Sequence, residues 1–515
     1  MTVRGATLVV VCLIGLGASA RPLPRSRRAA RPPLRVRGGE ARPTIERLDP
    51  SCNVRGDRPA SARLLEHSLP AALQTHEVLY EPRTRTVLAT QMEEGRLLRL
   101  AVDPATGELS RRSTRVGDKA EALSPSGELG NPVESARFDT APRPAGKPFV
   151  GLHGLALSET YPGRVWVTLQ YVNRVCLVDV ASLSIVGSFA CPATLADGAT
   201  PIGGPHSLVE KRGHLFVCMK GGASCHGPPD PAAAEDARAC AVWRVALAAP
   251  ADAADAADAA AAAADAPLTR DAGDVFRVPA TPPMCAVDDD GACWVVCDAF
   301  PALAYIPWRA RPTADDTSGS AKAQVMAGVG DDGARLARGE LPASAARLVL
   351  LPYQYAVLNG CGPGVTIGPD GRPWFCVLGG DGVVGTVGRD MRVKLFELHA
   401  NDWNPTPRLC HVRFDGDGVL YAISSDLIDK RAVNSLVRVR FDAAFEEVVA
   451  QHEFAMPTQA TCCHRVELVP GPDPARCSVV VSELSKAQLL QVFAATLPAL
   501  DRFPMKTMEV ATRRV

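Results

Sequence analysis

The chain has 515 residues, 47% of them hydrophobic, so it can bury one large core or several smaller ones. Lysine plus arginine and aspartate plus glutamate number 56 each, which excludes a strong overall field for nucleic acid or for a membrane surface. Beyond the first residues no apolar run is long enough to cross a bilayer. We therefore expect a protein with no nucleic-acid partner and no membrane span.

The N-terminus has the pattern of a targeting leader. Residues 1–20 resemble a secretory signal peptide, with an apolar run from Thr7 to Leu16 and small residues at Ala18-Ser19-Ala20. Residues 21–69 are basic and rich in proline and arginine, which predicts a disordered leader or pro-segment. Within it, Arg25-Ser26-Arg27-Arg28 is similar to a proprotein convertase site. We expect a secreted, extracellular protein; an organelle reached by a bipartite leader is the alternative.

The number of cysteines is relevant to whether the protein resides in an oxidising compartment. The chain has sixteen, and Cys12 lies in the predicted signal peptide, which leaves fifteen, an odd number. In an oxidising compartment several of these should form disulfide bonds. Cys225 and Cys240 flank a loop rich in glycine, proline and alanine and are a candidate pair. The spacing does not decide how the remaining cysteines connect.

One structural unit recurs along the chain. It consists of a short apolar strand starting near His or Pro, a turn with Gly or Asp-Gly, an aromatic-led strand, and a third strand of alternating character. Residues 153–178 and 363–387 are the clearest copies. Seven copies can be aligned, with starts near His76, His153, His206, Met284, Gly364, His411 and His464.

Seven such units predict an all-β protein, a seven-bladed β-propeller over residues 70–515, because sheets this small bury their faces only by packing around an axis. The irregular spacing leaves six or eight blades open. Insertions are expected at 103–146, 246–273 and 309–358, the second with an Ala/Asp-rich hairpin tip in blade three. A closing strand should come from one terminus, with residues 506–512 as the expected contributor.

The unit resembles the repeat of the streptogramin (virginiamycin B) lyases, and it is similar to the NHL-repeat and SMP-30-like propellers. The lyase resemblance implies elimination at a cyclic ester by a histidine base, with Mg²⁺ held by carboxylates. The glutamate that those lyases place two residues before a strand-starting histidine is absent, and Glu483 alone matches the second carboxylate position. The imidazoles are thus present and most of the metal carboxylates are not. The position two residues before each of the four strand-starting histidines is occupied by Gln74, Gly151, Gly204 and Cys462.

The histidines form a pattern of their own. In a closed ring, four of them would start the innermost strands of consecutive blades, namely His76, His153, His206 and His464. Imidazoles brought together there could act as a general base or bind a divalent metal such as Zn²⁺ or Fe²⁺. Alternatively, they satisfy backbone groups at the strand starts and line a wet channel. Glu483 is the candidate acid.

Two functions from different classes fit these features. The first is a secreted, monomeric propeller that binds a small molecule at the mouth of its axial channel, with lyase or hydrolase chemistry and Mg, Zn or Fe as the candidate metal. The alternative is a non-enzymatic scaffold that binds a protein or glycan partner through its long loops. The sequence does not decide whether the protein is an enzyme, and it specifies neither a substrate nor a metal.

Overall fold

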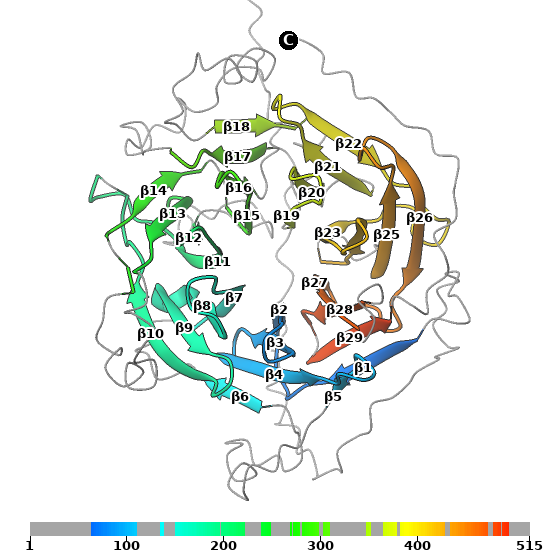
Figure 1. Cartoon of the computed structure of the whole chain (residues 1–515), viewed down its shortest axis with the longest axis horizontal. Helices are drawn as coiled ribbons and strands as arrows, with labels where there is room; N and C mark the ends of the chain where they lie inside the picture. The colour runs from blue at the N-terminus through cyan, green and yellow to red at the C-terminus, as the bar shows by residue number, and fades with distance from the viewer. Residues whose placement is uncertain are drawn as a thin grey trace, which may run out of the picture. The chain divides into compact units, whose positions relative to one another are not determined.

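The computed structural model describes residues 63–493, except 111–133, 138–149, 196, 222–237, 249–267, 270, 279–280, 298–301, 310–346, 352–363, 378–381, 428–432, 472–476 and 486. The described chain folds into seven antiparallel sheets arranged around a common axis (Figure 1). The predicted seven-bladed β-propeller is therefore confirmed. No α-helix occurs in the described residues, and none of their segments forms a helix able to cross a membrane.

Each blade is a meander whose first strand lies nearest the axis. Blade 1 contains β2 (Thr75–Glu81), β3 (Thr86–Gln91), β4 (Arg96–Val102), β5 (Leu109–Ser110) and β6 (Glu134–Arg137). Blade 2 contains β7 (Leu152–Leu157), β8 (Arg164–Leu169), β9 (Arg174–Asp179) and β10 (Ser184–Ala190), with the 3-10 turn η2 (Gln170–Val172) after β8. Blade 3 contains β11 (Gly204–Lys211), β12 (His214–Lys220), β13 (Ala241–Ala246) and β14 (Asp274–Arg277).

The remaining blades repeat this plan. Blade 4 contains β15 (Cys285–Val287), β16 (Cys293–Val296), β17 (Ala302–Ile306) and β18 (Arg347–Leu350). Blade 5 contains β19 (Val365–Ile367), β20 (Pro373–Val377), β21 (Val383–Val387) and β22 (Val393–Glu397). Blade 6 contains β23 (Leu409–Phe414), β24 (Val419–Ser424), β25 (Ser435–Phe441) and β26 (Val448–Ala455). Blade 7 contains β27 (Cys463–Val469), β28 (Ser478–Glu483), β29 (Gln488–Phe493) and β1 (Leu64–Ser68).

The ring is closed by the N-terminal strand. Strand β1 pairs antiparallel with β29 and forms the outer edge of blade 7. The expectation that residues 506–512 close the ring is wrong, because β1 occupies this edge; those residues lie outside the described chain. The propeller also begins at Leu64 at the latest, so the boundary drawn at residue 70 is several residues too late. Leu64 and Leu65 are both buried, and Leu64 packs into the core that blades 6 and 7 share, which explains why this segment joins the sheet.

The predicted insertions fall at the outer strands. The segment 309–358 contributes β18, which places the 348–351 run as the outer strand of blade 4. The Ala/Asp-rich tract separates β13 from β14 in blade 3, as expected for an expanded hairpin. The segment 103–146 contributes β5 and β6, both of which pair with β4. The described parts of these insertions thus belong to outer strands of the blades.

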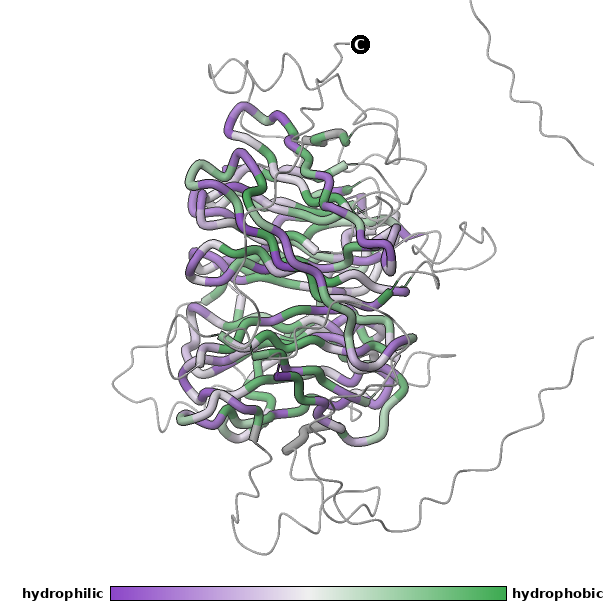
Figure 2. The backbone as a smooth tube through the Cα atoms, turned by 90° about the vertical axis from the view of Figure 1, so that its right-hand side faces the viewer, coloured by the Kyte–Doolittle hydropathy of each residue, from purple (hydrophilic) through white to green (hydrophobic). Residues whose placement is uncertain are grey.

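The cores lie between neighbouring blades. Trp166 of blade 2 packs with Leu215 and Trp243 of blade 3, and Trp374 of blade 5 packs with Phe441 of blade 6. The indole N–H of Trp374 donates to Asp370, which satisfies the polar atom of a fully buried ring. Along the tube in Figure 2, apolar strand segments alternate with hydrophilic turns. This packing of sheet against sheet holds the inner strands at fixed positions around the axis.

The cysteines do not behave as expected for a disulfide framework. All twelve described cysteines carry free thiols, eleven of them buried inside the blades. Cys240 donates to the carbonyl of Gly221, while its candidate partner Cys225 lies outside the described residues. The buried cysteine side chains pack as small apolar groups, so the disulfide bonds expected from the cysteine count are not seen among the described residues.

Candidate functional site

A β-bulge marks the start of five inner strands, β2, β7, β11, β23 and β27, and in four of them it contains an aligned histidine. In blade 1, Thr75 pairs with Gln91 and Val78 with Ala89, so that His76 and Glu77 together face Thr90. The same irregularity occurs in β7, β11 and β27, and it contains His153, His206 and His464 respectively. A bulge redirects side chains that regular alternation would send to opposite faces.

Hydroxyl groups tie these bulges to the next blade. Thr90 accepts the backbone N–H of Glu77 at 3.0 Å and donates to the carbonyl of His153 at 3.1 Å. Thr168 repeats this bridge from Gly154 to the carbonyl of His206, and Ser482 repeats it from Arg465 to the carbonyl of His76. Each histidine backbone in blades 1 to 3 is therefore positioned by the preceding blade.

The neighbouring blades approach closely at this level. A Cβ atom added to Gly154 would lie 2.5 Å from the carbonyl oxygen of His206, so only glycine fits there. The residue directly after His153 must therefore be glycine if blades 2 and 3 are to approach this closely. The histidine and the glycine that follows it form one structural device.

The four imidazole rings meet at the axis. The ring centroids of His153 and His206 are 3.5 Å apart, those of His76 and His153 3.7 Å, and those of His76 and His464 4.0 Å. All four side chains are buried. We call these residues, His76, His153, His206 and His464, the axial histidine group. The sequence alignment correctly predicted that they would converge; their roles as base or ligands remain predictions.

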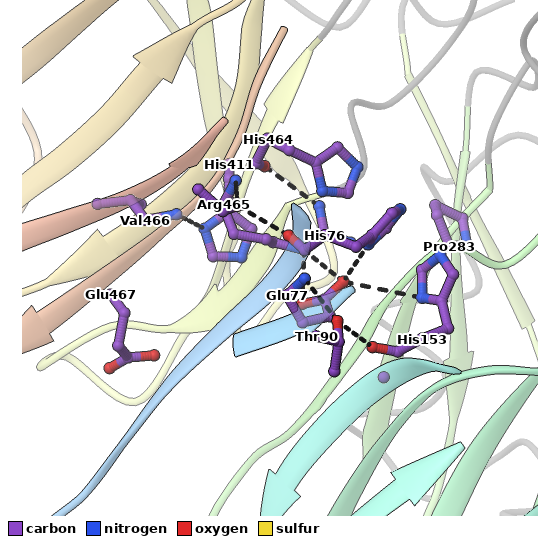
Figure 3. Close-up of polar contacts among 12 residues, drawn as sticks. His76, Glu77, Thr90, His153, Pro283, His411, His464, Arg465, Val466 and Glu467 are labelled. Carbon is purple, nitrogen blue, oxygen red and sulfur yellow. Dashed lines mark hydrogen bonds and ion pairs between the residues drawn. The ribbon is translucent and has the colours of Figure 1, made fainter. Parts of the chain in front are cut away.

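A buried carboxylate lies at the centre of this group (Figure 3). Glu77 accepts from Arg465 Nε at 2.9 Å on both carboxylate oxygens. Its Oε1 is also 3.2 Å from His76 Nδ1 and 3.9 Å from His153 Nδ1. Burial opposes ionisation of Glu77, but the guanidinium of Arg465 and the contact with His76 outweigh it and lower the pKa to about 2. The carboxylate is therefore charged at any ordinary pH.

The imidazoles, by contrast, have lowered pKa values, which favours their neutral form. Burial lowers the pKa of His76, and the hydrogen bond with Glu77 offsets this only in part. Burial also holds the pKa values of His153, His206 and His464 well below the usual range for histidine. Neutral imidazole has a free lone pair, which is the form that binds metals or accepts a proton.

The hydrogen bonds decide which ring nitrogen is available. His76 Nδ1 contacts Glu77, and His206 Nδ1 donates to the carbonyl of Pro283 at 2.9 Å. A neutral ring that donates through Nδ1 leaves its Nε2 lone pair free. The Nδ1 atoms of His153 and His464 are buried and have no hydrogen-bond partner. One donor atom each from His76, Glu77 and His464 lies within 4.8 Å of the others, a spacing near that of ligands to one ion.

Glu483, the candidate acid, and His411 occupy other positions in the sheets. Glu483 is fully buried on β28 and pairs across the sheet with Cys463, and its role stays a prediction. His411 accepts the N–H of Val466 through Nδ1 and helps to hold blade 6 against blade 7. The position of His411, one residue beyond the aligned position, accounts for its separate role.

Glu77 and Arg465 were missed by the sequence analysis. Each directly follows an aligned histidine, and regular strand alternation would place it on the opposite face from that histidine. The bulge removes this alternation. The signal that could have found them is the pair itself, since a carboxylate and a guanidinium occupy the same repeat position in adjacent blades.

No family model and no curated protein sequence matches the chain. Among solved structures, a catalytically inactive virginiamycin B lyase from Staphylococcus aureus with quinupristin is similar at 12% identity and a TM-score of 0.50, covering 84% of this chain and 99% of that chain. The selenomethionine form of that lyase gives 12% identity and a TM-score of 0.49, with coverages of 84% and 99%. A gluconolactonase from Xanthomonas campestris is similar at 14% identity and a TM-score of 0.35, covering 70% and 86%. At these identities the comparisons show the propeller fold, and the chain's chemistry has to be argued from its own residues.

Proposed function

We propose that the axial histidine group binds a divalent transition metal, and that the protein is a metal-dependent enzyme acting on a small molecule in the axial channel. One observation carries the proposal: four buried imidazoles from consecutive blades lie with neighbouring ring centroids 3.5–4.0 Å apart. Donor atoms of His76, Glu77 and His464 lie within 4.8 Å of one another, and the rings of His153 and His206 adjoin them.

The energetic cost of the cluster supports a ligand. A buried polar atom without a hydrogen bond costs about 1–3 kcal/mol, and the Nδ1 atoms of His153 and His464 are two such atoms. Glu77 and Arg465 add a buried ion pair, which is seldom more stabilising than apolar residues of the same volume. Packing alone would be served better by the leucine and valine side chains found elsewhere in the blades. Groups that cost stability in this way gather at functional sites.

The donor set selects the kind of metal. Imidazole suits Zn²⁺, Fe²⁺ and Cu²⁺, whereas Mg²⁺ prefers oxygen ligands with octahedral geometry. The one carboxylate in the cluster, Glu77, is held by Arg465 through both oxygens. The residues therefore do not fit the Mg²⁺ site implied by the streptogramin lyase resemblance, and we derive no Mg²⁺-dependent elimination.

The chain's own groups have defined tasks in this proposal. Glu77 and the carbonyl of Pro283 hold the Nδ1 atoms of His76 and His206, as second partners of metal-bound histidines commonly do. A bound metal of this class supplies Lewis acidity for polarising a carbonyl or ester oxygen, or for ionising water. Hydrolase or lyase chemistry on a small ester or lactone follows from that acidity. We further propose, from the leader pattern alone, that the protein is secreted.

Metal analysis of purified full-length protein tests the proposal. We expect about one equivalent of zinc, iron or copper and no retained magnesium, by elemental mass spectrometry after dialysis. His153→Ala should abolish retention, while His399→Ala, which removes an exposed imidazole outside the cluster, should leave it unchanged. Metal-free wild type after incubation with each of these metals, or equal retention in His153→Ala, would refute the proposal. A metal-free protein that captures a protein or glycan partner would favour the scaffold alternative.

A further inference from the structure

A buried arginine beside the axial histidine group has hydrogen-bond donors left over. Arg465 lies on β27 and is 1% exposed. Its Nε lies 2.9 Å from both carboxylate oxygens of Glu77, and its Nη1 donates to the carbonyl oxygen of His464 at 3.4 Å. Its Nη2 is also buried, but no described residue accepts a hydrogen bond from it. An Nη atom of a guanidinium has two N–H groups, so two donors at this position lack an acceptor.

A second arginine shows how the same fold satisfies a buried guanidinium. Arg244 lies on β13 of blade 3 and is buried to a similar degree. Its Nη1 donates to the carbonyl oxygen of Trp308 at 2.6 Å, and its Nη2 donates to Asp274 at 2.5 Å. A buried donor without an acceptor costs about 1–3 kcal/mol. The free Nη2 of Arg465 is therefore a specific feature of the axial position, and an unsatisfied group of this kind indicates a bound partner or a function.

The free donors lie at the edge of the axial histidine group. A guanidinium is planar and rigid, so Nη2 is fixed next to the Nε atom that contacts Glu77. The Oε1 atom of Glu77 is in turn 3.2 Å from His76 Nδ1 and 3.9 Å from His153 Nδ1. Figure 3 shows the side chain of Arg465 reaching from β27 to this carboxylate. A ligand held by the axial histidine group would therefore lie close to Nη2.

The charge balance decides which acceptor fits. The carboxylate of Glu77 contacts the guanidinium of Arg465 directly, so this pair has no net charge. The N–H groups of Nη2 therefore require an acceptor atom and not a further negative charge, and a neutral carbonyl oxygen meets that requirement. We propose that Arg465 recognises the ligand by donating from Nη2 to the carbonyl oxygen of a small ester or lactone. This inference rests on the proposed function and adds the residue that selects its substrate class.

Two ring compounds that differ by one carbonyl oxygen, γ-butyrolactone and tetrahydrofuran, test this. We expect ligand-observed NMR to detect binding of γ-butyrolactone to full-length protein as purified, and at least about 10-fold weaker binding of tetrahydrofuran. Arg465→Lys keeps a cation beside Glu77 but removes Nη2. It should weaken lactone binding by about 10- to 100-fold, the range for loss of a hydrogen bond to a charged group. Arg244→Lys is the matched control, because it changes a buried, ion-paired arginine outside the axial site, and it should bind the lactone as wild type does.

The outcomes separate this inference from the metal proposal. Arg465→Lys should retain the metal content of wild type, because it keeps all four imidazoles and the carboxylate of Glu77. If wild type holds no metal, the metal proposal fails, while lactone binding that depends on Arg465 still supports a carbonyl-binding site. Should Arg465→Lys not fold, the double variant Glu77→Gln, Arg465→Met removes both buried charges and should show the same loss of lactone binding. Equal binding of the two ring compounds, no binding of the lactone, or equal lactone affinity of wild type and Arg465→Lys would overturn the inference.

Discussion

The two halves of the ring share one fold and differ at the axis. Blades 7, 1, 2 and 3 start their inner strands with a bulge that contains a histidine. In blades 4 and 5, β15 and β19 pair with their neighbours without a bulge and have three residues each, and in blade 6 the bulge of β23 contains Cys410 where the other four contain a histidine. Both halves bury their cores between sheets in the same way. The comparison teaches that blade packing and axial chemistry are specified by different residues.

Strand β1 closes the ring in blade 7, which carries one of the four histidines. Deleting this strand should have the largest effect on the free energy of unfolding. A chain beginning at residue 70 lacks β1 and loses the burial of Leu64 and Leu65 and the pairing with β29. We expect a loss of about 5 kcal/mol or more, comparable with the whole stability of many domains. A chain beginning at residue 62 should unfold like the full-length protein in urea. Equal unfolding curves for the two truncated chains would show that β1 is dispensable.

A core substitution in the other half should separate stability from chemistry. Trp374 is fully buried and packs against Phe396, Phe414 and Phe441. Trp374→Ala should lower the free energy of unfolding by about 3–5 kcal/mol while the folded protein keeps its metal content. His153→Ala should instead abolish the metal content and change the free energy of unfolding little. If Trp374→Ala also emptied the axial site of folded protein, the two halves would be coupled and the comparison would break.

Lowering the pH should reduce the free energy of unfolding through the buried histidines of blades 7, 1, 2 and 3. A buried histidine with a lowered pKa stays neutral when folded and takes up a proton when unfolded, so its contribution to stability falls as the pH drops below about 6.5. Each such histidine should steepen the dependence of the free energy of unfolding on pH by about 1.4 kcal/mol per pH unit. Urea unfolding of chelator-treated protein between pH 8 and 5.5 measures this. His153→Asn should flatten the slope by that amount; an unchanged slope would mean that the imidazole of His153 is charged in the folded state.

Repeat alignment was enough to predict the blades and the meeting of four histidines. Apolar alternation and Gly-rich turns recur at every copy, and equivalent positions in a closed ring lie at the same level of the axis. The same reasoning could not find Glu77 and Arg465, because their placement depends on a bulge that breaks the two-residue period. It also missed β1, whose short apolar segment follows a proline- and arginine-rich stretch and carries no copy of the repeat.

The contact between Glu77 and Arg465 spans 388 positions of the chain. During synthesis the first blade leaves the ribosome long before the last one, and domains begin to fold from the N-terminus as they emerge. The axial site can therefore assemble only after translation has delivered β27, and a partly made chain has no complete site. A ligand that binds only the finished ring favours that state by mass action. Binding at the proposed axial site thus requires a chain made at least as far as β27.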